Sequence, residues 1–217
     1  KIGLDENHKI EIVNSTDKIK REKYVKHLYK RLQREGQLER DVDRLVRNDR
    51  IAWGSSMIAC NDADAMVTGN IRHYAASIDK LKKVVDPRKG EEIFGMTMIN
   101  SKGKTILVAD TNVEDFPSAK RLVNVSKSCV RVARLFGFDP KVAFLSHSTF
   151  GNPVSKNTKH VRDAINLLKQ EKVDFDFDGE MQPDVALNPI YQETYPFSKI
   201  VGKANILIMP ALHSAAI

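Results

Sequence analysis

The stretch that decides the fold is Pro140-Lys141-Val142-Ala143-Phe144-Leu145-Ser146-His147-Ser148-Thr149. Its first half contains the apolar run Val142–Leu145, which is typical of a strand buried on both faces of a parallel sheet. Its second half is polar and begins where that run ends. In open parallel sheets, ligands bind beyond the carboxyl ends of the strands. The stretch therefore predicts an α/β fold with a candidate site directly after this strand.

The same alternation extends through the second half of the chain. Strand-like runs are predicted at Ile93–Ile99, Thr105–Ala109, Val142–Leu145 and Ile206–Met209, and helices at Pro117–Phe136 and Asn157–Glu171. Apolar strands that alternate with helical segments predict a mainly parallel sheet with crossover helices.

The first half of the chain is predicted to be rich in helices. The expected helices are Ile19–Gln33, Leu38–Asn48, Ile51–Cys60 and Tyr74–Val85, with a short strand at Lys9–Asn14 and a short extended piece at Met66–Thr68. Ser15, Thr16 and Asp17 are the candidate caps of the first helix. A linker is expected at Pro87–Gly90, because proline cannot continue a helix. We therefore expect a first lobe over residues 1–87, an α/β lobe over 88–209, and a return toward the first lobe over 210–217.

Composition excludes several classes of protein. The chain has 217 residues, of which 41% are hydrophobic and 29% charged, as in ordinary globular proteins. No apolar run approaches the roughly 18 residues of a membrane-spanning helix. Cys60 and Cys129 lack the spacing of a disulfide framework or a zinc site, which favours a reducing, cytoplasmic compartment. Because the chain begins at Lys1 without methionine and ends at Ile217 after an apolar run, we expect a fragment of a longer polypeptide.

The net charge of +7 makes an anionic partner plausible without identifying it. Basic residues are concentrated in Lys18–Arg50, where acidic residues are interleaved and no aromatic is spaced to stack bases. This pattern favours a solvated helix face over a nucleic-acid surface.

Small polar groups follow two of the predicted strands, in Asp110–Asn112 and Ser146–Pro153. Hydroxyls, amides and backbone N–H groups there can hold phosphate or carboxylate oxygens, or can simply complete turns and helix caps. The acidic turn Asp178–Gln182 has the alternatives of a metal site, a base and a helix cap. His147 and His213 are isolated, so each is either a base or an ordinary hydrogen-bonding side chain. The motifs GxGxxG, Walker A and HExxH are absent, which leaves hydride transfer, NTP hydrolysis and zinc proteolysis without sequence support.

At these loops the sequence resembles phosphate acetyltransferases (phosphotransacetylases). The resemblance rests on the stretches Ala63–Gly69, Ala109–Asn112, Pro140–Thr149, Asp178–Gln182 and Gly202–Pro210. It is closest to the phosphotransacetylase-type domain of bacterial hybrid NADP-dependent malic enzymes. That branch is favoured by Phe150–Pro153, Val185–Pro189, Tyr195–Phe197 and Leu212–Ser214.

The resemblance implies a two-lobed α/β fold that binds acetyl-CoA or CoA in a cleft between the lobes. It implies a regulatory acetyl-CoA site and an oligomer contact, most simply in a homodimer or a larger homo-oligomer, with no nucleic-acid or membrane partner. The malic-enzyme domain of the parent would decarboxylate malate to pyruvate with NADP and Mg²⁺ or Mn²⁺. No catalytic or metal-binding residue is expected in this segment.

Two departures argue against catalysis by this segment alone. Asp79 stands in the register where active transferases carry a phosphate-binding arginine, and a carboxylate repels phosphate. The family's Ser-Arg pair and general-base aspartate would lie beyond Ile217.

The resemblance also suggests which residues bind the ligand. Asn112, Ser146, Ser148 and Thr149 are candidates for the acetyl or pantetheine end. Arg72 and Tyr74 are candidates for the phosphates and adenine, because arginine binds phosphate bidentately. The remaining candidates are Lys203 and Asn205, on the other side of the cleft, and His213 and Ser214, on the return to the first lobe. The alternatives to the regulatory domain are an active phosphate acetyltransferase and a purely structural oligomerisation module.

Overall fold

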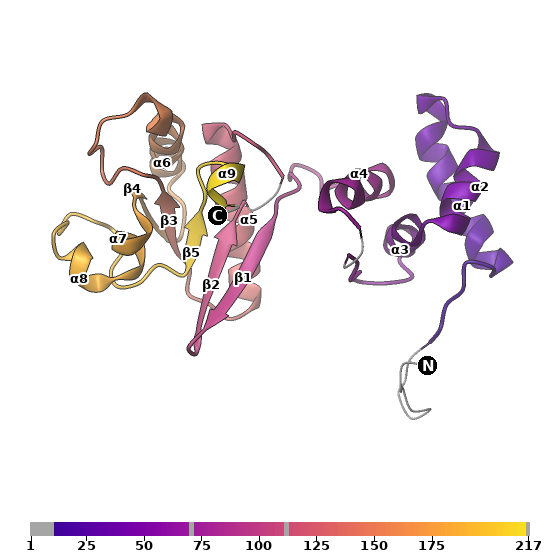
Figure 1. Cartoon of the computed structure of the whole chain (residues 1–217), viewed down its shortest axis with the longest axis horizontal. Coiled ribbons are helices and arrows are strands. Elements are labelled where there is room, and N and C mark those ends of the chain that lie inside the picture. The colour runs from indigo at the N-terminus through magenta and orange to yellow at the C-terminus, as the bar shows by residue number, and fades with distance from the viewer. Residues whose placement is uncertain (1–10, 70–71, 111–112, 216–217) are drawn as a thin grey trace. The chain divides into compact units, whose positions relative to one another are not determined.

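A computed structural model describes residues 11–69, 72–110 and 113–215 of the chain (Figure 1). The chain divides between Asp86 and Pro87 into two compact units, unit 1 (residues 1–86) and unit 2 (residues 87–217). Each unit has its own buried core. None of the described helices is long and apolar enough to cross a membrane.

Unit 1 is helical. Its elements are α1 (Lys18–Leu32), the short 3-10 helix η1 (Gln33–Glu35), α2 (Glu39–Asn48), α3 (Arg50–Ala59) and α4 (Tyr74–Val84). Asp17 caps α1 by accepting hydrogen bonds from the backbone N–H groups of Ile19 and Lys20. Tyr24 and Trp53 meet edge to face in the core, with ring centroids 5.0 Å apart. The four helices predicted for this half of the chain are confirmed.

Two predicted extended segments of unit 1 are not strands. Residues 11–14, the described part of Lys9–Asn14, form no strand, and neither does Met66–Thr68. Ile12 is 91% exposed and Val67 is fully exposed. Alternating apolar residues make a strand only where another strand pairs with them and a core covers one face. No strand of the described residues pairs with either segment, although Val13 does pack against the core of unit 1, which explains the errors.

Unit 2 is built on a five-stranded sheet in the order β1-β2-β5-β3-β4. The strands are β1 (Met96–Ser101), β2 (Lys104–Ala109), β3 (Lys141–Leu145), β4 (Asp176–Met181) and β5 (Ile206–Ile208). The pairs β2–β5, β5–β3 and β3–β4 are parallel, and β1 pairs antiparallel with β2. The prediction of a mainly parallel sheet is confirmed. Positive φ angles at Lys102 (49°) and Gly103 (72°) make the tight β1–β2 turn, a conformation that glycine adopts readily.

Helices cover both faces of this sheet. They are α5 (Ala119–Leu135), the 3-10 helix η2 (Lys156–Thr158), α6 (Lys159–Glu171), α7 (Pro183–Leu187), α8 (Pro189–Gln192) and α9 (Leu212–Ala215). Successive side chains of a strand face opposite ways. Phe144 accordingly packs in the core with residues of α5 and α6, whereas Ala143 and Leu145 pack in the second core with residues of α7. Burial on both sides explains the continuous apolar runs of β2, β3 and β5.

The interpretation of Asp178–Gln182 as an acidic turn is wrong, because most of it belongs to strand β4. Its carboxylates are buried and have partners distant in sequence. Asp178 accepts a hydrogen bond from the backbone N–H of Lys199 (2.7 Å), and Glu180 is 1% exposed. Charged residues in a strand are tolerated here because the fold satisfies them with hydrogen bonds.

Candidate functional site

The carboxyl ends of the four parallel strands lie at one edge of the sheet, which we call the carboxyl edge. The segment Ser146–Pro153, the β3 loop, begins there directly after β3. The backbone N–H of Ser146 donates to the carbonyl of Met181 (3.0 Å), and that of Phe150 donates to the carbonyl of Glu180 (2.7 Å). These bonds attach the β3 loop to the end of β4.

The carboxylate of Glu180 organises the β3 loop. Its Oε1 accepts hydrogen bonds from Ser148 Oγ (3.0 Å) and the backbone N–H of Gly151 (3.0 Å), and a charge-assisted one from Arg162 Nη1 (3.1 Å). Arg162 is held in turn by Thr158 Oγ1 (2.7 Å). A buried carboxylate is stable only with such partners. Neither Glu180 nor Arg162 had been singled out individually, since nothing local in the sequence links residues 18 apart.

Three sequence-predicted binding residues therefore come together here. Ser146 and Ser148 have their hydroxyl oxygens 3.4 Å apart, and Thr149 Oγ1 accepts from the backbone N–H of Gln182 (3.2 Å). All three side chains are buried, and Ser148 is completely buried. Their hydroxyls hold the loop in shape. The exposed groups that the loop presents belong to other residues, His147 among them.

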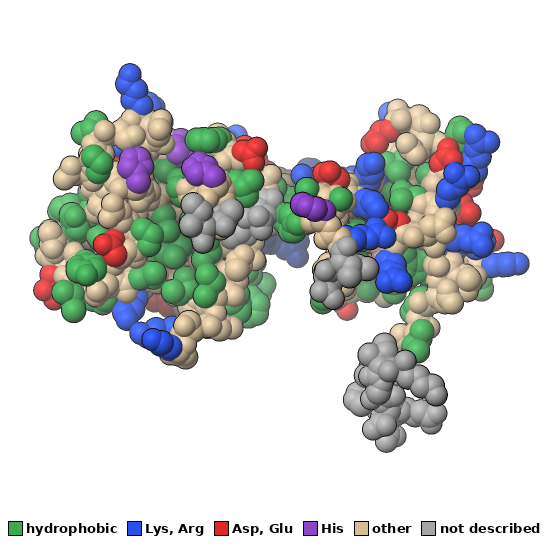
Figure 2. All heavy atoms as spheres, viewed as in Figure 1, with side chains coloured by type: hydrophobic (Ala, Val, Ile, Leu, Met, Phe, Trp, Pro, Cys, Tyr) green, Lys and Arg blue, Asp and Glu red, His purple; other side chains and the backbone are tan. Residues whose placement is uncertain are grey.

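Histidine side chains gather at the carboxyl edge, as Figure 2 shows, and the histidines of unit 2 are His147, His160 and His213. His160 Nε2 lies 2.9 Å from the carbonyl oxygen of Pro210, which follows β5. His213 stacks beside Phe116 with ring centroids 5.6 Å apart. The predicted residues His213 and Ser214 thus sit in α9, just beyond the same edge. The role of His160 was missed, because its carbonyl partner is 50 residues away.

Asp110, directly after β2, is engaged in a buried ion pair. Its Oδ2 accepts from Arg121 Nη2 (2.8 Å), and its Oδ1 accepts from the backbone N–H of Gly95 (2.7 Å). Burial opposes the charge of Arg121, but hydrogen bonds to Asp110 and Glu92 outweigh it and raise the pKa of Arg121. This loop is therefore anchored to α5. The predicted binding residue Asn112 lies outside the described residues.

Lys203 and Asn205 lie at the other edge of the sheet, where the parallel strands begin; we call it the amino edge. Asn205 Oδ1 accepts from the backbone N–H of Lys141 (2.8 Å), and its Nδ2 donates to the carbonyl of Asp139 (2.6 Å). Asn205 thus fixes the start of β3. The structure does not bring these two residues to the β3 loop.

Arg72 and Tyr74 belong to unit 1. Arg72 Nη1 forms an ion pair with Asp49 Oδ2 (2.6 Å), and Lys80 contacts the same oxygen. Asp49 is buried at the start of α3, where it also caps the helix. Tyr74 is the first residue of α4 and is half exposed. Arg72 therefore has a structural partner in addition to its predicted role with phosphate.

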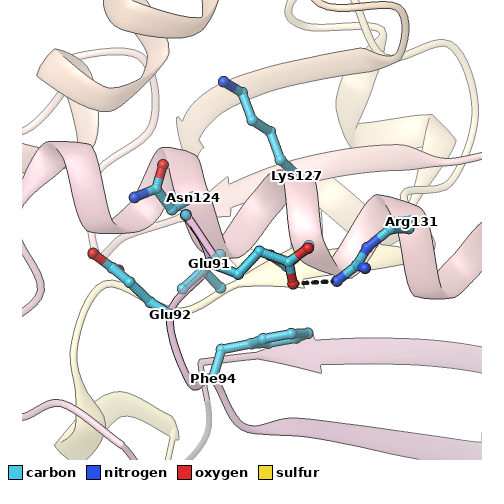
Figure 3. Close-up of a pocket in the computed structure, with 9 residues that line it drawn as sticks. Glu91, Glu92, Phe94, Asn124, Lys127 and Arg131 are labelled. Atoms are coloured by element: carbon cyan, nitrogen blue, oxygen red, sulfur yellow. Dashed lines mark hydrogen bonds and ion pairs between the residues drawn. The ribbon is translucent and has the colours of Figure 1, made fainter. Parts of the chain in front are cut away.

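A separate pocket of about 250 Å³ lies beside α5 and is lined by residues of Gly90–Phe94 and of the helix. Figure 3 shows Glu91 pointing toward Arg131, and these side chains form an ion pair of 2.6 Å. Lys127, also on the pocket wall, pairs with Glu171. Both cations on the wall of this pocket, Lys127 and Arg131, are therefore already neutralised by glutamates. In the described part of the chain, no three or more His, Cys, Asp and Glu side chains gather as a metal site would require.

A mainly parallel sheet covered on both faces, with polar loops at its carboxyl edge, defines an open α/β fold, a class in which ligands usually bind at that edge. The sequence matches the family described as phosphate acetyl/butaryl transferase over residues 1–217, and the chain belongs to that family. It is 43% identical over 208 residues to an NADP-dependent malic enzyme of Rhizobium meliloti, and 37% identical over 218 residues to a probable NADP-dependent malic enzyme of Rickettsia prowazekii. Each match covers 96% of this chain, which spans 27% and 28% of those relatives.

The fold agrees with this membership. A phosphotransacetylase from Streptococcus pyogenes superposes with a TM-score of 0.77 at 26% identity, over 88% of this chain and 60% of that one. The chain is thus a phosphotransacetylase-like domain, related both to a segment of malic enzymes and to phosphotransacetylases.

Proposed function

We propose that this chain is the regulatory, phosphotransacetylase-type part of an NADP-dependent malic enzyme. In this proposal it binds acetyl-CoA at the carboxyl edge and contributes to oligomerisation. The observation that carries it is the 43% identity to a malic enzyme across 96% of the chain. The oxidative decarboxylation of malate to pyruvate, with NADP and Mg²⁺ or Mn²⁺, would belong to the rest of the parent protein.

The β3 loop supports binding rather than turnover. Its hydroxyls are tied into the network around Glu180, so the loop is preorganised and its buried serines are not free nucleophiles. A ligand would meet the exposed outer groups, such as His147 and Asn152. Asp79 is exposed on α4, in the register where the resemblance expects an arginine for phosphate. A carboxylate at that position disfavours acetyl phosphate as a substrate.

The family match and the Streptococcus pyogenes structure favour a second function, that of a phosphate acetyltransferase. Such an enzyme would convert acetyl-CoA and phosphate into acetyl phosphate and CoA. A third function, an oligomerisation module without a ligand, predicts self-association and no binding of acyl-CoA. The three functions differ in what they bind and what they convert.

Isothermal titration calorimetry of the purified chain with acetyl-CoA, CoA and acetyl phosphate in separate titrations distinguishes them. The regulatory function predicts saturable binding of acetyl-CoA and no release of CoA when phosphate is added. Formation of acetyl phosphate would establish the transferase instead. A folded sample that binds none of the three compounds would refute both ligand-binding functions.

Arg72 provides a residue-level test with a matched control. Arg72→Ala and Lys80→Ala each remove one cation from Asp49, so both variants should destabilise unit 1 similarly. Only Arg72 is predicted to contact a CoA phosphate. We therefore expect Arg72→Ala to weaken acetyl-CoA binding by about tenfold, the loss typical of one charge-assisted hydrogen bond, and Lys80→Ala to leave it unchanged. Equal effects of the two substitutions would remove Arg72 from the site.

A further inference from the structure

A hollow of about 440 Å³ opens at the amino edge of the sheet, opposite the β3 loop. It is lined by Lys104, Thr105, Ile106, Phe138, Leu187, Lys203, Ala204 and Asn205. We call it the lysine pocket. Figure 2 shows basic side chains at the end of unit 2 where the β1–β2 turn lies.

The sheet register places the two lysines side by side. Leu107 of β2 pairs with Ile206 of β5 in parallel. Lys104 stands three residues before Leu107, and Lys203 stands three residues before Ile206. The two lysines therefore occupy equivalent positions on neighbouring segments of the same sheet. Both side chains are exposed and line the same pocket.

Other polar groups of the pocket are already used within the protein. Asn205 bonds the backbone with both its side-chain oxygen and its nitrogen. Thr105 Oγ1 donates to Asn100 Oδ1 (2.7 Å), and the backbone N–H of Ala204 donates to the carbonyl of Ala186 (2.9 Å). The side-chain polar groups of the pocket that remain available to bind a ligand are the ammonium groups of Lys104 and Lys203.

Lys104 and Lys203 have no ion pair with any carboxylate of the described residues. The cations of the pocket beside α5 differ, because Lys127 and Arg131 each have a glutamate partner. The close approach of the Lys104 side chain lowers the pKa of Lys203, because two like charges held near each other repel. Within the described part of the chain these two ammonium groups lack a counter-ion, and an anion bound between them would relieve their repulsion.

We propose that the lysine pocket binds a phosphate monoester that carries an apolar body. A phosphate monoester brings close to two negative charges at neutral pH and so matches two lysines, whereas one carboxylate would match only one. Ile106, Phe138 and Leu187 supply an apolar wall that a hydrocarbon or aromatic body would cover. This site is separate from the β3 loop and does not depend on the proposed function, because it lies at the opposite edge of the sheet.

The test uses phenyl phosphate as the probe, with inorganic phosphate and phenol as its two halves. Binding to the full chain is followed by NMR titration at low ionic strength, where electrostatic attraction is least screened. We expect saturable binding of phenyl phosphate, weaker binding of phosphate, and none of phenol. Lys203→Gln and Lys104→Gln should each weaken the binding of phenyl phosphate by about tenfold, the cost of losing one charge-assisted hydrogen bond.

Lys169→Gln is the matched control, because it removes the same charge from an exposed lysine of α6 in the same unit. It should leave the affinity unchanged. The proposal is overturned if the binding of phenyl phosphate does not saturate. It is also overturned if Lys169→Gln weakens that binding as much as Lys203→Gln does, because this would indicate attraction to the net charge alone.

Discussion

Asp49→Asn should destabilise unit 1, because Asp49 holds three parts of that unit together. Its carboxylate accepts hydrogen bonds from the backbone N–H groups of Ile51 (2.9 Å) and Ala52 (3.2 Å), and it pairs with Arg72 and Lys80. The side chain is 9% exposed. Burial by itself would raise the pKa of Asp49, but the hydrogen bonds from Lys80, Arg72 and the backbone outweigh it and lower the pKa to about 2.

The size of the effect follows from this pKa. Asparagine caps a helix about as well as aspartate, so the substitution removes mainly the ionic part of the interaction. A fall from 3.8 to about 2 corresponds to about 2 kcal/mol, at 1.36 kcal/mol for each pKa unit. Arg72 and Lys80 are each about one-third exposed, so solvent screens part of this energy. We expect a loss of about 1 to 2 kcal/mol at neutral pH.

The pH dependence has a definite sign. The pKa of Asp49 is lower in the folded protein than in the unfolded chain, so its contribution to stability is complete above about pH 4 and is lost as the pH falls toward about 2. The difference between the wild-type protein and the Asp49→Asn variant should therefore shrink across that range. It should be constant from about pH 5 to pH 8.

Trp53 makes the measurement specific to unit 1, since it is the single tryptophan of the chain and is buried in α3. Urea unfolding is followed by its fluorescence. Asp17→Asn is the control, because Asp17 also caps a helix but forms no ion pair among the described residues. If Asp49→Asn costs no more than Asp17→Asn, or if its cost persists at pH 2, the ion pairs are not the source of the stability.

Three further predictions concern unit 2. Glu180→Ala leaves the buried Ser148 hydroxyl without its acceptor and should cost about 3 kcal/mol or more in urea unfolding followed by circular dichroism; a loss below about 1 kcal/mol would contradict this. Asn205→Ala removes the acceptor of the Lys141 N–H and should cost about 1 to 2 kcal/mol while acetyl-CoA binding, measured by calorimetry, stays the same. Burial raises the pKa of Cys129 to about 12, so a thiol reagent at pH 8 should label it only when unit 2 unfolds; rapid labelling of the native protein would show that the thiol is accessible.

Much of the fold follows from local pattern. The apolar run of β3 and the helical spacing of α1 are each formed by neighbours in sequence, and both segments were predicted within one or two residues of their bounds. Strand β4 was missed because its acidic residues and glycine form a pattern that is typical of a turn. Their burial depends on Lys199 and Ser148, which lie 21 and 32 residues away.

The site was predictable only in part. Ser146, Ser148 and Thr149 follow a buried strand, so their assembly at the carboxyl edge could be foreseen. Their burial could not, because it depends on Glu180. Lys203 was expected on the other side of the ligand cleft. It comes just before β5, which places it at the amino edge of the sheet, away from the β3 loop.

The central position of β5 has a consequence for how unit 2 is made in the cell. Among the described residues β5 is the last strand in sequence, yet it lies between β2 and β3. Until Ile206–Ile208 has left the ribosome, β1–β2 and β3–β4 are two separate pairs with unpaired inner edges. Unit 1 consists of helices with nearby contacts and can fold while the rest is being translated. A chain that stops before Ile206 would therefore contain all the helices of residues 1–86, but its second unit would remain in two halves.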